Sequence, residues 1–387
     1  MIMNLIEEIV KKYKTDGIRG VLYGAILRIY LICLIFINRI RGFDGKDLDV
    51  VQSKIQKAIK KRPEIYNLDE ADAKALADNW NGVINKPQDL RFIEHAIPVV
   101  LTAGERFVPY MAVTLQSLLN NSNSERKYHF IILNEDFSDK TKELLTQQVS
   151  HFSHCAIDFV NIVHAFNGIP IAAPGAYYSI GTYSRFFIPY WFDKYEKVIF
   201  LDSDIMAKAD IAELYDIDIS DSFLGAAVDQ IVEEQLNLKS YGFFLNSSPV
   251  FMLLNNWSHY FNAGILIFDT KKFKTKISQQ DIFYFTIYYS NRYNNIMNDQ
   301  DILNLLMKDD YYVLPPEWNY MWSVLTKNER YQSSKPNTKI VHFTSILKPW
   351  INDPLIEKNS DVLEYRKLAS SIPLFKLNTA TNSENSD

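Results

Sequence analysis

The stretch "KVIFLDSDIMAK" (residues 197–208) joins a short apolar run to two carboxylates, Asp202 and Asp204, that are one residue apart. The apolar run is typical of a strand buried in a sheet. Residues i and i+2 of an extended chain point to the same side, so both carboxylates can project from one side of the strand end. There they can bind one hard divalent cation such as Mg²⁺ or Mn²⁺. A chain that simply leaves a sheet through polar residues shows the same pattern, so the pair alone leaves both interpretations open.

Apolar runs typical of strands lie on both sides of this stretch and alternate with helical patterns. Strands are predicted at 96–103, 127–135, 155–162, 197–202 and 223–229, and helices at 109–122 and 139–149. This alternation predicts an α/β fold with a mostly parallel sheet flanked by helices. Such sheets bind ligands at the carboxyl ends of their strands, which is where Asp202 and Asp204 would lie.

The charge is distributed unevenly along the chain. The net charge is −5, which argues against nonspecific binding to nucleic acid. Up to Arg62 there are thirteen Lys and Arg against six Asp and Glu, so the remainder carries −12. The two cysteines, Cys33 and Cys155, exclude a disulfide scaffold and favour a reducing compartment. We therefore predict a basic arm attached to an acidic globular body.

An apolar segment near the amino terminus indicates contact with a membrane surface. Between Val21 and Ile37 the only charged residue is Arg28, and these seventeen residues fall short of the about 20 that span a bilayer. The basic flanks favour a helix lying in the membrane surface, with a membrane span and a helix packed in the globule as alternatives. We expect a membrane-associating helical arm at 1–47, a helical linker at 48–95, the α/β domain at 96–375 and a disordered polar tail at 376–387.

An aspartyl phosphatase also places two aspartates after a buried strand, and there the first aspartate is the nucleophile. Phosphatases of this kind usually continue with Gly and then Thr or Val, whereas this chain continues with Ile205 and Met206. The downstream Gly-Asp pair that completes their magnesium site is also missing from the sequence. The pattern therefore disfavours a phosphatase.

Further stretches carry polar residues that could share one site with the two aspartates. They are "GTYSRFFIPYWF" (181–192) with Arg185, "YFNAGILIFD" (260–269) with Asn262, "NDQDILNLL" (298–306) with Asp299 and Gln300, and "KIVHFTSILKPW" (339–350) with His342 and Lys348. Ala263 and Gly264 are small, which allows backbone and ligand to approach closely. Together with "LDSD", these motifs resemble those of the family 8 glycosyltransferases, in the same order and over about residues 96–352.

The resemblance implies a GT-A fold, a UDP-sugar donor, Mn²⁺ (or Mg²⁺) as cofactor, and transfer with retention of the anomeric configuration. Carried over by position, Asp202, Asp204 and His342 match metal ligands, and Lys348 matches a contact to the diphosphate. Thr102 and Phe107 lie in the segment that matches the uridine contact. The donor sugar would be held by Arg185, Asp229, Asn262, Asp299 and Gln300. Of these, Gln300 would lie beneath the anomeric carbon, with Asp299 beside it as the second catalytic residue.

Two departures from the family pattern affect the nucleotide pocket. Gly104 stands where Asp or Asn is common, and Ser345 replaces a glycine near the diphosphate. Phe107 stands where Tyr is usual, which preserves stacking on uracil. A nonenzymatic sugar- or partner-binding relative with a decayed donor site is therefore the alternative hypothesis.

The resemblance and the arm together predict a retaining hexosyltransferase at the cytoplasmic face of the inner membrane. It would move galactose or glucose from UDP-hexose to a hydroxyl of a lipid-linked or cell-surface glycan such as lipopolysaccharide. We expect it to be cytoplasmic, peripheral to that membrane through residues 1–47, and without a nucleic-acid partner. The segment 240–260, rich in Phe and Tyr, is the predicted acceptor loop, although a hydrophobic lid or core segment would have the same composition.

Overall fold

The computed structural model describes the α/β domain and a few residues ahead of it. Placed residues are 86–87, 90–165, 180–237, 257–292, 298–307, 310–322, 337–344 and 347–375. The arm predicted at 1–47, most of the linker at 48–95 and the tail at 376–387 lie outside the described residues. So do Ser345 and all but the last residues of the acceptor loop predicted at 240–260. The domain boundaries therefore remain predictions.

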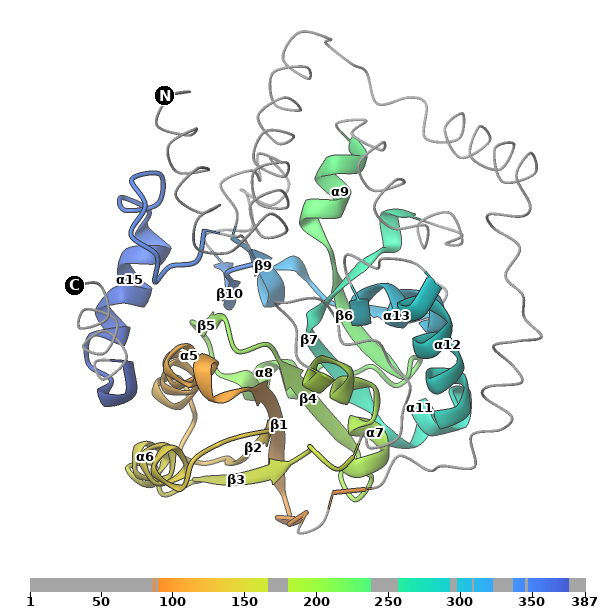
Figure 1. Ribbon diagram of the computed structural model, residues 1–387, viewed down its shortest axis with the longest axis horizontal. Helices are drawn as coiled ribbons and strands as arrows, with labels where there is room; N and C mark the ends of the chain where they lie inside the picture. The colour runs from red at the N-terminus through yellow and green to blue at the C-terminus, as the bar shows by residue number, and fades with distance from the viewer. Residues whose placement is uncertain are drawn as a thin grey trace, which may run out of the picture.

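A seven-stranded sheet forms the centre of the described part, in the order β3-β2-β1-β4-β7-β6-β8 (Figure 1). Its strands are β1 (Ala96–Ala103), β2 (Lys127–Asn134), β3 (Cys155–Asn161), β4 (Lys197–Leu201), β6 (Leu224–Val228), β7 (Phe261–Asp269) and β8 (Tyr312–Val313). The strands β3, β2, β1 and β4 pair in parallel, and β7 runs antiparallel to both of its neighbours. The predicted mostly parallel α/β sheet is confirmed.

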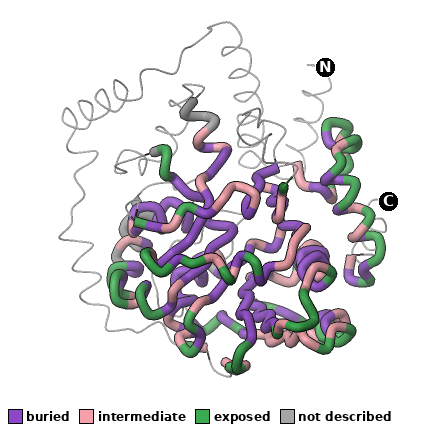
Figure 2. The backbone as a smooth tube through the Cα atoms, turned by 180° about the vertical axis from the view of Figure 1, so that it is seen from behind, coloured by how far each residue is buried: buried purple, intermediate pink, exposed green. Residues whose placement is uncertain are grey.

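Helices cover both faces of this sheet, and two hydrophobic cores lie between the layers. One face carries α5 (Val108–Asn120), α6 (Asp139–Ser150), α8 (Ile211–Tyr215) and α15 (Ser360–Ala369). The other carries η2 (Ile180–Phe186), α7 (Ile188–Trp191), α11 (Thr270–Lys276), α12 (Gln279–Arg292) and α13 (Asn298–Met307). Burial on both faces explains why β1, β4 and β7 read as continuous apolar runs rather than as alternating patterns. Figure 2 shows the buried strands inside and the exposed turns outside.

The segment 181–192, which carries Arg185, is divided between two short helices. Residues Ile180–Phe186 form the 3₁₀ helix η2, and α7 begins only at Ile188. Pro189 lies in the first turn of α7, where its missing N–H costs no hydrogen bond and its fixed φ suits a helix start. The division leaves Arg185 at the end of η2, on the side of the sheet where β4 ends.

A second, three-stranded sheet positions Asp202, Asp204 and His342, the candidate metal ligands. It has the order β5-β10-β9, with β5 at Ile205–Ala207, β9 at Tyr320–Met321 and β10 at Ile340–His342. The antiparallel pairing of β10 with β5 places His342 opposite Ile205. The loop between β4 and β5 therefore carries Asp202 and Asp204 to the end of β10.

The buried side chain of Thr114 holds the loop that carries the two aspartates. Thr114 on α5 is fully buried, and its hydroxyl lies 2.9 Å from the carbonyl oxygen of Ser203 and 2.8 Å from that of Ile205. The single hydroxyl proton is shared between these two carbonyl groups.

The remaining described helices, including α9 (Gln230–Asn237), are short or polar, and none could cross a bilayer.

Replacing Thr114 by Val should lower the free energy of unfolding by about 1–3 kcal/mol, because two buried carbonyls lose their shared donor while the shape is kept. Denaturant unfolding followed by circular dichroism measures this. Thr275→Val is the matched control, since Thr275 is exposed and its hydroxyl also bonds to a backbone carbonyl. Its effect should stay within about 0.5 kcal/mol. Equal effects of the two variants would contradict the bracing role.

Candidate metal and donor-sugar site

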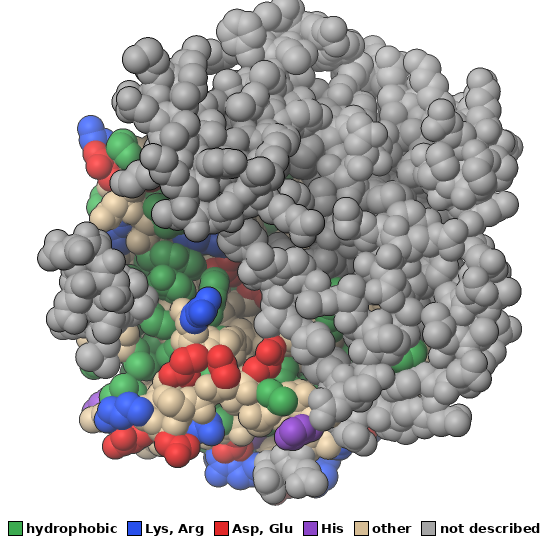
Figure 3. Space-filling model, in the orientation of Figure 1, with side chains coloured by type: hydrophobic (Ala, Val, Ile, Leu, Met, Phe, Trp, Pro, Cys, Tyr) green, Lys and Arg blue, Asp and Glu red, His purple; other side chains and the backbone are tan. Residues whose placement is uncertain are grey.

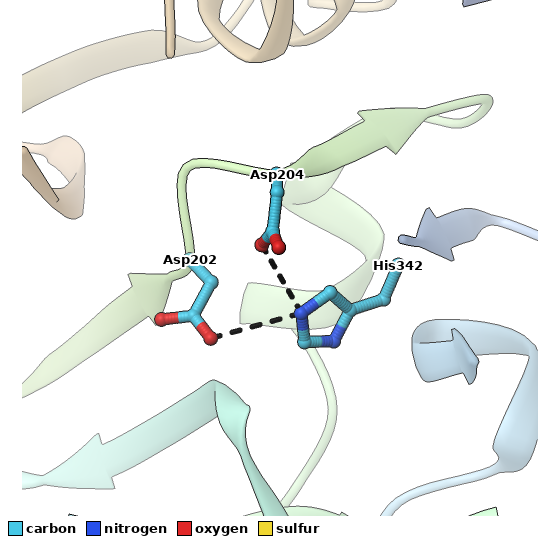
Figure 4. Close-up of side chains that lie close together, drawn as sticks. All are labelled: Asp202, Asp204 and His342. Atoms are coloured by element: carbon cyan, nitrogen blue, oxygen red, sulfur yellow. Dashed lines mark ion pairs between the residues drawn. The ribbon is translucent and has the colours of Figure 1, made fainter. Parts of the chain in front are cut away.

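Two side chains of the β4–β5 loop, Asp202 and Asp204, meet His342 of β10 at the carboxyl end of β4 (Figure 4). His342 Nε2 lies 3.2 Å from Asp204 Oδ1 and 3.7 Å from Asp202 Oδ2. One ligand atom from each of the three residues lies within 4.8 Å of the others. The structure thus brings together Asp202, Asp204 and His342, as the sequence predicts. Their role as metal ligands remains a prediction.

The ligand atoms of these three side chains suit a divalent cation. Three acceptor atoms face one point, and such atoms repel one another unless a proton or a metal ion lies between them. Two carboxylates and one imidazole are ligands that Mn²⁺ accepts, whereas Mg²⁺ prefers oxygen alone. The side chains of Asp202 and Asp204 are 27% and 14% exposed, so the point is accessible, while His342 is buried at 3%.

Gly264 explains how the three side chains can come so close. Its carbonyl accepts the backbone N–H of Asp202 at 2.7 Å. A Cβ built on Gly264 would lie 2.6 Å from Asp202 Oδ2 and would overlap the ring of His342. The small residue before the apolar run of β7 is therefore required for steric reasons. Any side chain at this position would displace two of the three candidate ligands.

Lys348 adds a positive charge on the outer side of Asp204. Its Nζ lies 2.6 Å from Asp204 Oδ2 and 2.6 Å from the carbonyl oxygen of Phe343. Burial favours a protonated Asp204, but its neighbours, above all the charge of Lys348, outweigh burial and hold the pKa of this carboxyl well below its usual range. Asp204 is therefore ionised at neutral pH and available to a cation.

Arg185 joins the loop that carries Asp202 and Asp204 to α13. Its guanidinium bonds to Asp202 Oδ1 at 3.1 Å and to Asp299 Oδ2 at 2.9 Å, and donates to the carbonyl oxygen of Ala263 at 2.6 Å. The cation also lies 4.5 Å from the centre of the Phe200 ring. Burial raises the pKa of Asp299 to about 7; Arg185 opposes the rise, and the charge of Asp202 adds to it. The predicted donor residues Arg185 and Asp299 thus lie beside the metal ligands.

A second cluster of buried polar side chains lies next to the first. Asp229 Oδ2 accepts hydrogen bonds from Asn262 Nδ2 at 3.2 Å and from Gln300 Nε2 at 3.0 Å. Gln300 Oε1 accepts from Asn262 Nδ2 at 3.1 Å and from the backbone N–H of Ala263 at 3.0 Å. Burial raises the pKa of Asp229, although its hydrogen bonds oppose the rise. The structure therefore brings together Asp229, Asn262 and Gln300, three of the residues that the resemblance assigns to the donor sugar.

An aromatic cluster lies where the uridine contact was predicted. Phe107 is 40% exposed and meets Tyr110 and Trp350 edge-on, with ring centroids 5.3 and 6.0 Å apart. Tyr110 and Trp350 stack at 3.8 Å. The carbonyl of Thr102, at the end of β1, accepts a hydrogen bond from Ser203 Oγ at 2.7 Å, which ties this segment to the carboxylate loop. In the described part of the face drawn in Figure 3, acidic, basic and hydrophobic side chains are intermingled.

The two departures from the family pattern have different outcomes. Gly104 lies beside this cluster, and among the described residues apart from its chain neighbours only Asp136 Oδ1, at 3.7 Å, is close to a Cβ built there. The described residues therefore leave space for a side chain at residue 104. Ser345 lies outside the described residues, so its effect on the diphosphate contact stays a prediction.

Asn319 is a residue of the site that the sequence reading missed. It is fully buried in η5 (Pro316–Asn319), and its side chain lies between His342 and Asn262. The only signal in the sequence is one amide within the aromatic run "EWNYMW" (317–322). A buried polar residue among aromatics needs partners, but their identity depends on the pairing of β9 with β10, which is nonlocal.

Asp299→Asn should make the pH dependence of stability shallower. The folded pKa of Asp299, about 7, lies above its ordinary value, so between about pH 4 and 7 the folded state keeps a proton that the unfolded chain has lost. The free energy of unfolding should therefore fall as pH rises through this window, by up to about 1.4 kcal/mol per pH unit, and level off above it. Urea unfolding of both proteins from pH 4.5 to 8 measures the difference; parallel curves would contradict it.

Comparisons with known proteins agree with the fold and with the motifs. The family model described as glycosyl transferase family 8 matches residues 98–353. A protein of Haemophilus influenzae is 28% identical over 227 residues, which covers 57% of this chain and 62% of that protein. The lipopolysaccharide 1,2-glucosyltransferase of Escherichia coli is 24% identical over 254 residues, covering 62% of this chain and 68% of that enzyme.

A solved structure shows the same architecture. The galactosyltransferase LgtC, in complex with donor and acceptor sugar analogs, superposes with a TM-score of 0.55 and 23% identity, covering 72% of this chain and 96% of that chain. This likeness supports the GT-A fold. Since the family model covers most of the α/β domain and its motifs converge at one site, the chain belongs to glycosyl transferase family 8.

Proposed function

We propose that the chain is a retaining hexosyltransferase that uses a UDP-hexose and Mn²⁺ (or Mg²⁺). It moves galactose or glucose to a hydroxyl of a lipid-linked or cell-surface glycan such as lipopolysaccharide. The observation that carries the proposal is the convergence of Asp202, Asp204 and His342 beside the cluster of Asp229, Asn262 and Gln300. A cation site beside a cluster of polar side chains that can bind a sugar is what the transfer of a sugar from a diphosphate requires.

The charges of the site suit a diphosphate leaving group. A bound divalent ion supplies Lewis-acid stabilisation of the departing UDP. Lys348 lies on the outer side of Asp204, where its ammonium group can turn one of its three N–H donors to a phosphate oxygen. The aromatic cluster around Phe107 offers an exposed ring face on which uracil can stack. Metal, diphosphate and base would then lie in sequence along the ends of β4 and β1.

The hydrogen bonds of Gln300 bear on how retention is achieved. Oε1 already accepts from Asn262 Nδ2 and from the backbone N–H of Ala263, so both of its lone pairs are used. A covalent bond from Oε1 to the anomeric carbon would have to break one of these bonds. An amide is also a weak nucleophile. The arrangement favours a front-face reaction through a short-lived ion pair, in which Gln300 holds the sugar and Asp299 lies beside it.

The membrane arm and the acceptor class are further parts of the proposal. The lipopolysaccharide 1,2-glucosyltransferase of Escherichia coli is a relative by sequence, and lipopolysaccharide is the glycan in its name. The basic apolar arm at 1–47 would hold the enzyme at the cytoplasmic face of the inner membrane, close to such an acceptor.

Removal of 1–47 should move the protein from the membrane fraction to the soluble fraction. Unchanged partitioning would contradict this role for the arm.

The nonenzymatic alternative rests on two sequence departures: Gly104 stands where Asp or Asn is common in the family, and Ser345 replaces a glycine near the diphosphate. A screen for UDP release separates the two hypotheses. The full chain is incubated with UDP-glucose or UDP-galactose, with and without Mn²⁺. Metal-dependent release from one donor supports the enzyme. No release from either donor, together with no effect of Mn²⁺ on the affinity for UDP, would contradict transfer from these two donors.

Asp204→Asn should lower the rate of UDP release by at least about 100-fold, because the site loses one charged ligand and the partner of Lys348. Steady-state release at saturating Mn²⁺ measures the loss. Asp216→Asn is the matched control: Asp216 pairs with Arg126 at the surface, away from the site, and its loss should leave the rate unchanged. An Asp204→Asn variant as active as the control would rule out the metal assignment.

A further inference from the structure

Asn319 lies between the candidate metal site and the donor-sugar cluster. Its Oδ1 lies 2.9 Å from Nδ1 of His342, and its Nδ2 donates to Oδ1 of Asn262 at 3.0 Å. The side chain is fully buried, so these two groups are its partners rather than water. The orientation of the Asn319 amide therefore determines whether its oxygen or its nitrogen faces Nδ1 of His342.

The orientation of that amide is fixed by a backbone group. The N–H of Gly264 donates to Asn262 Oδ1 at 3.0 Å, and a backbone N–H can only donate. Oδ1 of Asn262 is thus an acceptor, and the Asn319 atom that faces it must be the NH₂ group. The carbonyl oxygen of Asn319 must then face the imidazole. The usual ambiguity of amide orientation is absent here, because the chain of hydrogen bonds starts at a group that cannot be reversed.

The same logic determines the protonation of the imidazole. An oxygen acceptor at 2.9 Å from Nδ1 requires a proton on Nδ1. The neutral ring then carries its lone pair on Nε2, the atom that faces Asp202 and Asp204. In the other tautomer, Nδ1 and the carbonyl oxygen would be two acceptors in contact, and Nε2 could not bind a metal.

We infer that Asn319 is a positioning residue that holds His342 in the Nδ1–H tautomer and so presents Nε2 to a divalent cation. This inference rests on the proposed function only for the identity of the site, and it concerns binding of the ion rather than turnover. Partners of this kind typically account for a 10- to 100-fold change in metal affinity. Asn319 also couples the ion to the sugar pocket, since the same amide holds Asn262.

The test measures Mn²⁺ affinity of the full chain by electron paramagnetic resonance, with no UDP-sugar present. Asn319→Leu keeps the size but removes the acceptor, and should weaken Mn²⁺ binding by about 10- to 100-fold. Asn319→Asp keeps an oxygen facing Nδ1 and should stay within about threefold of the wild type, even if its contact with Asn262 is lost. This rescue distinguishes a role in metal binding from a role in folding alone.

A structural control comes from Gln230. It is fully buried and donates to the backbone carbonyl of Asn319 at 2.8 Å, so it supports the same turn without touching His342. Gln230→Met should lower the free energy of unfolding but leave the Mn²⁺ affinity of the folded protein within about threefold of the wild type. If Gln230→Met and Asn319→Leu weaken Mn²⁺ binding equally, Asn319 only supports the fold and the inference is overturned.

A spectroscopic readout tests the tautomer directly. The chain, labelled with ¹⁵N-histidine and loaded with diamagnetic Zn²⁺, contains seven histidines, and His342→Gln assigns the signal. The wild type should show a protonated Nδ1 and a metal-bound Nε2, and Asn319→Leu should lose the slowly exchanging Nδ1–H. A metal-bound Nδ1 in the wild type, or a wild type that binds no Mn²⁺, would overturn the inference. Mn²⁺ binding without UDP release would contradict the proposed transfer and leave this inference standing.

Discussion

The antiparallel pairing of β5 with β10 is the interaction on which the site depends. The backbone N–H of Phe343 donates to the carbonyl of Asp204 at 3.0 Å, and this bond joins residues far apart in the chain. A shift of one residue in this register would turn His342 to the opposite face and remove it from the carboxylates. The site also needs Gly264, because a side chain there would overlap those of Asp202 and His342.

The second constraint is the balance of buried charge. Three carboxylates, those of Asp202, Asp204 and Asp299, share two fixed cations, Arg185 and Lys348. When all three carboxylates are ionised, this group has a net charge of −1, and a divalent ion would change it to +1. A site with that charge attracts a diphosphate only after the metal has bound. The raised pKa of Asp299 fits the same balance, since a third negative charge is unfavourable here until a cation arrives.

The sequence predicts the local parts of this structure well. The strands at 96–103 and 197–201 appear as apolar runs of the right length, because both of their faces are buried. The paired carboxylates and the polar motifs point to the site because strand ends on one edge of a sheet meet there. The geometry of Asn319 could not be predicted. It depends on which residue of β9 lies beside His342, and nothing local in "EWNYMW" specifies that register.

The donor-sugar cluster is built mainly from neutral amides, and this choice has a physical reason. Asn262, Gln300 and Asn319 are all nearly or fully buried, where an unpaired charge would be costly and a paired amide is not. Gln300 and Asn262 are each oriented by a donor that cannot reverse, the backbone N–H of Ala263 and of Gly264 respectively, and Asn319 is oriented in turn by Asn262. The polar groups that would face a ligand are therefore fixed before the ligand arrives, and in the proposed transfer little reorganisation would be needed as charge develops at the anomeric carbon. Gly264 takes part in both devices: its missing Cβ lets the candidate ligands meet, and its N–H orients Asn262, which orients the Asn319 amide that holds the histidine.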